Sequence, residues 1–220
     1  MKEAGLSELC TLIAAVRRSV AAPARLYLVS RTSHLAEGWC DRVPAFELAG
    51  DAHLRPGSGG QAGGAALGDA VREAGRALGV DLVWESPADV IPLPAGWEER
   101  SLGAEALAKA ARPATIEQGG TESALELRHF DPYSVVLRLI ARGDEPDYVA
   151  ALEYVRHDWV EPARLEGLLA EVVPRMTNQT LAQDPAEFRR KFKGLRQLYL
   201  RSHTVYSPGG TRAGEAVSSS

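Results

Sequence analysis

Residues 25–48 read RLYLVSRTSHLAEGWCDRVPAFEL, and this stretch determines the expected fold. It opens with a short apolar run of β type, Arg25–Val29, and closes with another, Phe46–Leu48. Between them, Thr32–Trp39 predicts a helix. We expect the two strands to lie side by side, with the turn Val29-Ser30-Arg31-Thr32-Ser33 at the strand-to-helix junction, where sites form in mixed α/β domains.

Outside this stretch, the N-terminal half alternates further helices and strands. An apolar stripe at helical spacing stops near Pro23, and a second one ends at Gly79. Val80–Trp84 and Ala124–Phe130 predict strands, separated by a long proline-containing loop. The fold class is therefore α+β, with a small mixed sheet and helices packed on it over residues 1–130. The first stripe is Leu6, Leu9, Ile13, Val16 and Val20; the second is Leu67, Val71, Ala74 and Leu78.

Four prolines in the C-terminal half follow an acidic residue, and each pair predicts a helix start. An acid suits the positive end of the helix dipole, and proline fits the first turn because its missing N–H is not needed there. An apolar face at helical spacing follows each pair, so residues 131–203 predict a helical bundle. The pairs are Asp131-Pro132, Glu145-Pro146, Glu161-Pro162 and Asp184-Pro185.

The glycines, in contrast, gather in three places. Gly50–Gly68 reads GDAHLRPGSGGQAGGAALG, which predicts a stretch too rich in glycine to pack as an element. Gln118–Thr121 predicts a loop, and residues 204–220 predict a disordered tail.

Composition excludes several classes of protein. The 220 residues include 25 Lys+Arg and 29 Asp+Glu, giving a net charge of −4, with 45% hydrophobic residues. These values exclude a collagenous, coiled-coil or broadly disordered chain and give no signal for DNA binding. The two cysteines, Cys10 and Cys40, form no CxxC or Cys/His cluster that would indicate structural zinc. The N-terminus lacks a signal-peptide pattern, and no apolar run approaches the roughly 18 residues needed to span a bilayer, so we expect a cytoplasmic protein.

Three segments resemble a known family. Val29-Ser30-Arg31, a spacer from Thr32 to Pro44, and Ala45-Phe46-Glu47-Leu48 follow the spacing of minimal nucleotidyltransferases, in which a hydrophobic residue, Gly, and Gly or Ser precede an acid–hydrophobic–acid–hydrophobic strand. RLYLVSRTSHLAEGW, SPADVIPLPAGWEERS and HFDPYSVVLRLIARGDEPDYVAAL, in that order, are similar to segments of bacterial AbiEii-toxin-like nucleotidyltransferases. The resemblance covers roughly residues 25–200.

The resemblance implies a nucleotidyltransferase-like fold and a set of site residues. It implies an NTP as substrate, Mg²⁺ as the metal, RNA or protein as the acceptor, and an antitoxin-like protein as a partner. Glu47 would hold the metal and, with Arg138 and Asp147, would form the catalytic set. The nucleotide-binding residues would be Ser30, Arg31, Thr32, Ser33 and Arg142.

Two departures from the family pattern affect the expected activity. Ser30 and Arg31 replace the paired glycine that lets the backbone approach a triphosphate, and Ala45 replaces the first metal-binding acid. Two Mg²⁺ ions normally need several carboxylates, and only Glu47 remains of the pair. The first hypothesis is therefore an impaired or inactive nucleotidyltransferase-fold protein that binds nucleotide, RNA or a protein partner. The second is an active, Mg²⁺-dependent transferase.

Each candidate also has a simpler interpretation. Glu47 is equally an exposed acid at a strand end, and Arg31 a surface arginine at a helix start. Asp147 complements a helix dipole, and Asp131, a conceivable third acid, is first a helix cap. The helix after Pro185 carries six basic and two acidic residues over 184–203, which indicates either a surface for RNA or an acidic partner, or a solvated helix face.

Overall fold

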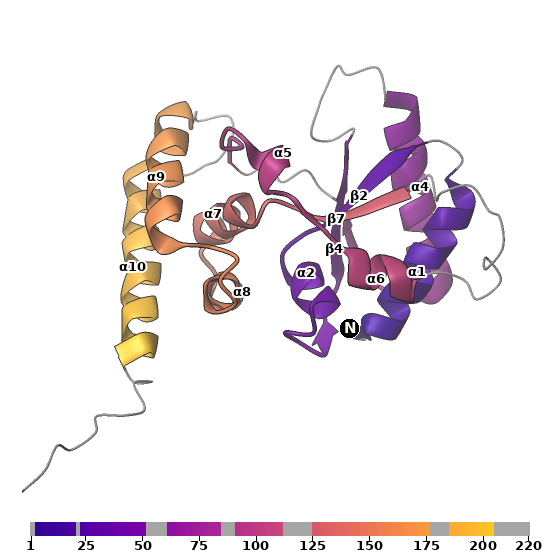
Figure 1. Ribbon diagram of the computed structural model, residues 1–220, viewed down its shortest axis with the longest axis horizontal. Coiled ribbons are helices and arrows are strands. Elements are labelled where there is room, and N and C mark those ends of the chain that lie inside the picture. Colours follow the sequence, from indigo (N-terminus) through magenta and orange to yellow (C-terminus); the bar gives the residue numbers. More distant parts are fainter. Residues whose placement is uncertain are drawn as a thin grey trace, which may run out of the picture.

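The computed structural model describes residues 3–20, 23–51, 61–84, 91–111, 125–176 and 185–204. A five-stranded mixed sheet in the order β5-β4-β2-β7-β6 stands at the centre, with helices on both of its faces (Figure 1). β2 is antiparallel to β4 and parallel to β7, so the expected neighbouring strands of residues 25–48 are confirmed. β5 is parallel to β4, and β6 is antiparallel to β7. The strands are β2 (Ala24–Leu28), β4 (Phe46–Gly50), β5 (Leu82–Trp84), β6 (Leu102–Gly103) and β7 (Leu125–His129).

One face of the sheet packs on α1 (Leu6–Ser19), α4 (Gln61–Leu78) and α6 (Glu105–Ala110). Successive strand residues point to opposite faces, so Leu26 and Leu28 of β2 join this core while Tyr27 does not. Most of the two predicted apolar stripes supplies its other side: Leu9, Ile13 and Val16 of α1, and Leu67, Val71 and Ala74 of α4, are buried. Leu12, outside the predicted stripe, is buried with them, whereas Leu6 is 42% exposed.

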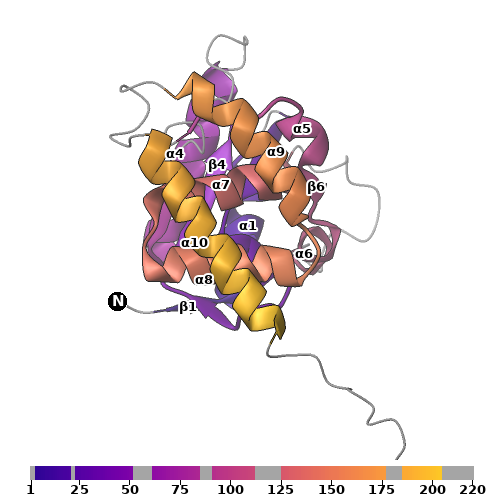
Figure 2. The ribbon, with the colours of Figure 1, turned by 90° about the vertical axis from the view of Figure 1, so that its left-hand side faces the viewer.

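The other face packs on α7 (Pro132–Arg142). Tyr27, Val29 and Ala49 share one continuous core with the C-terminal helices, so the regions 1–130 and 131–203 lie directly against each other. α9 and α10 form an outer layer over α7 and α8 (Figure 2). The remaining elements of this side are α8 (Glu145–Arg156), α9 (Pro162–Val172), the short 3₁₀ helix η2 (Val173–Arg175) and α10 (Pro185–Thr204).

A helix starts at each of the four acid–proline pairs, as expected, although Asp184 itself lies outside the described residues. At the first of them, the Asp131 carboxylate accepts a hydrogen bond from the Tyr133 N–H and caps α7. The carboxylate is fully buried and also forms a two-bond ion pair with Arg100, at 3.0 and 2.7 Å. Asp131 is therefore a helix cap, as its simpler interpretation proposed, and it also anchors the segment before it through Arg100.

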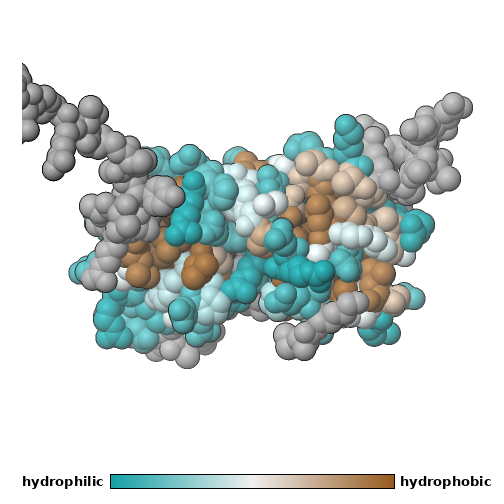
Figure 3. Space-filling view, turned by 90° about the horizontal axis from the view of Figure 1, so that it is seen from below, coloured by the Kyte–Doolittle hydropathy of each residue, from teal (hydrophilic) through white to brown (hydrophobic). Residues whose placement is uncertain are grey.

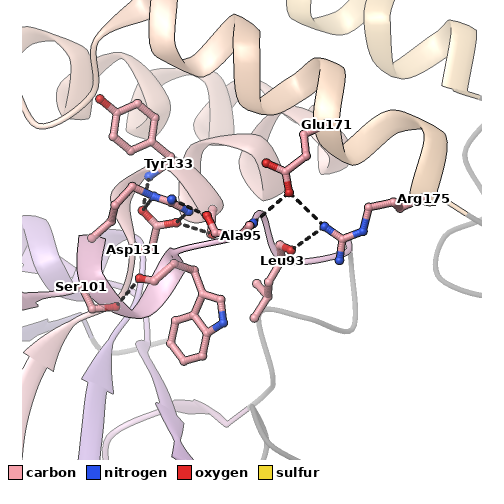
Figure 4. A network of polar contacts seen from close by, with 10 residues as sticks. Leu93, Ala95, Ser101, Asp131, Tyr133, Glu171 and Arg175 are labelled. Carbon is pink, nitrogen blue, oxygen red and sulfur yellow. Dashed lines mark hydrogen bonds and ion pairs between the residues drawn. The ribbon is translucent and has the colours of Figure 1, made fainter.

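The prediction of a long loop before β7 is wrong in part, because this segment contains α5 (Trp97–Arg100), β6 and α6. Polar contacts hold this segment between α7 and α9 (Figure 4). Arg100 bonds Asp131 and the Ala95 carbonyl, and the Ala95 N–H donates to Glu171 at 2.8 Å. The contacts with Asp131 and Glu171 join residues far apart in the sequence, so no local pattern indicates them.

The glycine-rich stretch is also more ordered than expected. β4 runs to Gly50 and α4 begins at Gln61. A Cβ at Gly50 or Gly68 would lie within about 3.1 Å of the Trp84 indole, so glycine here allows close packing. Residues 52–60, the predicted loop at 118–121 and the tail from 205 lie outside the described residues, whereas 204 still belongs to α10.

Two further differences concern short elements. β1 (Ala4–Gly5) and β3 (Arg42–Val43) form a two-stranded ribbon that the sequence did not predict, and α2 (Arg31–Ala36) is shorter than the expected Thr32–Trp39.

On the face drawn in Figure 3, hydrophilic side chains separate the apolar patches. Within the part of the chain that is described, no helix combines the length and apolar character needed to cross a membrane.

Candidate functional site

The turn between β2 and α2 has an unusual backbone at Ser30. Its φ of 52° and ψ of −124° lie in a region that residues with a side chain seldom adopt. This is the position at which the resembling family carries glycine. The Ser30 carbonyl accepts a hydrogen bond from the Tyr154 hydroxyl of α8 at 3.0 Å, which holds the turn against the helical side. Backbone strain of this kind persists where surrounding structure enforces it, and it gathers at functional sites.

Thr32 and Ser33 attach this turn to the neighbouring strands. Thr32 Oγ1 accepts the Glu47 N–H at 2.7 Å, and Ser33 Oγ donates to the Leu28 carbonyl at 3.0 Å. Both side chains are buried. The structure therefore places Thr32 and Ser33, both nucleotide-binding candidates, where their side chains join the turn to β4 and β2.

Glu47 lies on the sheet face that meets α7, because Phe46 and Leu48 occupy the opposite face. Its side chain is only 14% exposed, so the interpretation of an acid exposed to water is wrong. Its Oε2 makes no hydrogen bond with the described residues and lies 4.0 Å from Arg142 Nη1. Burial raises the pKa of Glu47, although Arg142, Arg138 and the Ser30 hydroxyl favour its charged form.

Arg142 and Asp147 meet across the turn between α7 and α8. Two hydrogen bonds of 3.0 and 2.7 Å join the guanidinium to the carboxylate, in the bidentate geometry that is strongest for this pair. Burial alone would lower the pKa of Arg142, but Asp147 and Glu47 outweigh burial and leave it raised. The guanidinium of Arg142 thus contacts both candidate carboxylates.

Arg138 lies one helical turn before Arg142 on α7 and is 2% exposed. Burial and the charge of Arg142 lower its pKa to about 10, so it stays protonated at neutral pH, while Glu47 and Asp147 oppose that shift. Arg31 of α2 reaches the start of α8, where its Nη2 donates to the Pro146 carbonyl at 3.0 Å. The structure therefore brings together Ser30, Arg31, Glu47, Arg138, Arg142 and Asp147, which the sequence spreads over more than a hundred positions.

These residues do not fit a centre with two Mg²⁺ ions. Ala45, immediately before β4, offers no ligand, and each remaining carboxylate faces a guanidinium. Over the described ranges, no three His, Cys, Asp or Glu side chains are placed to share a metal ion. Mg²⁺ requires near-octahedral oxygen ligands, of which one or two usually are carboxylates for each ion.

A layer of aromatic residues behind Ser30 escaped the sequence analysis. Tyr154 packs against His34 with ring centroids 4.6 Å apart and the ring planes inclined by 58°, and Trp39 stacks on His157 at 4.1 Å. Burial, aided by Arg31 and His157, lowers the pKa of His34 to about 3, so its ring is neutral. Tyr154 occupies an apolar position of α8, and nothing in its local pattern indicates the bond to Ser30.

A separate hollow of about 470 Å³ opens at the other end of α7, lined by Tyr133, Trp159, Arg100 and Arg164 among others. The charge of Arg100 there is neutralised by Asp131. Glu47 Oε2 and Ser30 Oγ, which are buried and make no hydrogen bond with the described residues, instead lie toward the C-terminal end of α7. We place the candidate site there. Comparisons with protein-family models, with curated proteins and with solved structures find no match to this chain.

Proposed function

We propose that this chain is a nucleotidyltransferase-fold protein that binds the phosphates of a nucleotide, free or within RNA, and lacks efficient metal-dependent transfer. The observation that carries the proposal is the convergence of the strained Ser30 turn with Glu47 and the Arg142–Asp147 pair between the sheet and α7. The sequence resemblance assigns phosphate binding to this same turn.

The charges of the site favour an anionic ligand. Three guanidinium groups, of Arg31, Arg138 and Arg142, accompany two carboxylates, of which Glu47 has a pKa that burial raises. Guanidinium groups bind phosphate oxygens in bidentate geometry, and Arg31 donates within the described chain only to a carbonyl. A phosphate could therefore accept further hydrogen bonds from Arg31 and Arg142.

The arrangement also carries a stability cost that packing does not explain. A strained serine and a buried carboxylate oxygen without a hydrogen bond both destabilise the folded state. Such departures from local consistency are expected at functional sites, where the ligand supplies the missing contacts.

Isothermal titration calorimetry with ATP, GTP, CTP and UTP, in EDTA and in Mg²⁺, tests the proposal. At least one nucleotide should bind in EDTA, and Arg142→Met should weaken binding at least about tenfold, the effect of losing one charged hydrogen bond. Arg76→Met is the matched control, because Arg76 is exposed near the end of α4, on the opposite face of the sheet. Absence of binding, or equal binding by the Arg142 variant, would contradict the proposal.

The second candidate function is active, Mg²⁺-dependent transfer of a nucleotide to RNA or protein. It rests on the sequence resemblance and on the proximity of the Glu47 and Asp147 carboxylates, although each of them faces the Arg142 guanidinium. Incubation with labelled NTPs, Mg²⁺ or Mn²⁺ and total tRNA tests it, beside Glu47→Ala and Ala45→Asp. Label transfer that is lost in Glu47→Ala would replace the first proposal with this one.

A further inference from the structure

Lys191 of α10 contacts the last residues of α7, about fifty positions earlier in the chain. Its Nζ donates to the Ala141 carbonyl at 2.9 Å and to the Arg142 carbonyl at 3.2 Å. The side chain is 19% exposed, and Glu187, one turn earlier on α10, lies 3.7 Å from the same ammonium group. A cation from another helix thus completes the end of α7.

A cation is favourable at the C-terminal end of α7. The last four carbonyls of a helix have no partner within it, and they form the negative end of the helix dipole. Gly143, with φ of 76°, turns the chain away and satisfies the Leu139 carbonyl through its own N–H. The carbonyls of Ala141 and Arg142 come after that bond, and Lys191 donates a hydrogen bond to each of them.

This turn carries the central group of the candidate site. Arg142, whose carbonyl Lys191 binds, extends its side chain to Asp147 on α8 and toward Glu47 on β4. A shift of the turn would therefore move the guanidinium relative to both carboxylates. Lys191 is not needed to dock α10 itself, because Phe188, Phe192 and Leu195 bury an apolar face against the other helices.

We propose that Lys191 is a positioning residue of the site: by closing the end of α7 it fixes Arg142, and it makes the placement of α10 a determinant of ligand affinity. The proposal deepens the proposed function and rests on it. Mutations that act through a neighbouring element commonly change affinity by twofold to about thirtyfold.

The test compares Lys191→Met with Lys193→Met. Both remove one positive charge from α10, but Lys193 is exposed and forms no hydrogen bond or ion pair with the described residues of α7. Lys191→Met keeps the aliphatic stem and loses only the donor. Amide hydrogen exchange should become faster at Gly143, Asp147 and Tyr148 in the Lys191 variant alone. Unchanged exchange there would overturn the proposal without reference to any ligand.

Nucleotide affinity supplies the second readout, measured where every variant is fully folded. Lys191→Met should weaken binding of the NTP that the wild-type chain prefers roughly fivefold, and Lys191→Arg, which can still donate to two carbonyls, should restore most of it. Faster exchange with unchanged affinity would assign Lys191 to stability alone and overturn the positioning role. A wild-type chain that binds no NTP contradicts the proposed function, and with it the role in affinity, whereas exchange still decides whether Lys191 fixes the turn.

Discussion

The two faces of the sheet differ in what they bury. Toward α1 and α4 the core consists of aliphatic and aromatic side chains such as Ile13, Leu28 and Val71. Toward α7 and α8 the protein also buries ionisable groups, among them Asp131, Arg138 and Asp147, and none of the fully buried polar residues that are described belongs to α1 or α4. Buried charges contribute little net stability and need partners. The core toward α1 and α4 therefore stabilises the fold, whereas the core toward α7 and α8 contributes less stability and holds the candidate site.

The largest effect expected on the polar face comes from Asp131→Asn. The change leaves the nearly buried Arg100 without its counter-charge, which typically destabilises a protein by about 3–5 kcal/mol. Urea unfolding at pH 7 measures the loss. Asp69→Asn is the control, since Asp69 pairs with Arg72 at the surface and should change stability by less than about 1 kcal/mol. Equal effects would remove the distinction between the faces.

On the aliphatic face, Ile13→Ala should lower the free energy of unfolding by about 3 kcal/mol, because it opens a cavity in a fully buried position. Nucleotide affinity of the folded molecules should not change, because α1 contributes nothing to the site. Calorimetry below the unfolding temperature checks this. A loss of affinity would show that the two faces are coupled.

His34→Phe should make the protein more resistant to acid. A histidine whose folded pKa lies below its unfolded value stabilises the protein above about pH 6.5 and loses that contribution as the pH falls toward 3. Phenylalanine keeps the ring contacts with Tyr154 and Trp39 without the proton. Between pH 7 and 4.5 the variant should lose about 2 kcal/mol less stability than the wild type.

His157→Phe is the matched control for this change. His157 also stacks on Trp39, but its side chain is 41% exposed. Urea unfolding at the two pH values should give the wild-type difference for this variant. If the His34 variant also matches the wild type, the buried histidine does not govern acid sensitivity.

The smallest expected effect is a gain in stability rather than a loss, and it comes from Glu47→Gln. Because the pKa of Glu47 is raised by burial, its charged form is disfavoured in the folded state at neutral pH. Glu47→Gln should therefore raise stability at pH 7 by less than about 1 kcal/mol, and the gain should disappear as the pH falls and the wild-type carboxyl becomes protonated. Thermal unfolding from pH 4 to 7 measures it, and a variant less stable than the wild type would contradict the assignment.

Local patterns predicted the elements well where one residue type dictates the backbone. The acid–proline pairs marked α7 to α10, and the β-type runs of residues 25–48 marked β2 and β4. Short elements such as β6 were not predicted because they exist through pairing with β7, and the close approach of Gly68 in α4 to Trp84 was not predicted either. Such contacts depend on residues that are distant in sequence.

The candidate site, like the fold, was predictable where local patterns decide and not where long-range contacts decide. Six of the eight predicted site residues meet, since strand alternation and helix spacing bring Glu47, Arg138 and Arg142 to facing surfaces. The burial of Glu47 depends on which helix covers its strand, and no single-sequence pattern contains that information. The bonds from Tyr154 to Ser30 and from Lys191 to Arg142 are equally long-range.

The pairing of β2 also has a consequence for how the chain folds. β2 reaches β4 over about twenty positions, but its parallel partner β7 is about a hundred residues away, as the ion pair of Arg25 with Glu126 illustrates. Closing the longer loop costs more entropy, so β7 and the helices behind it join late. During synthesis, the segment that bears Ser30 and Glu47 emerges first, so the candidate site stays incomplete until Arg138, Arg142 and Asp147 have also left the ribosome.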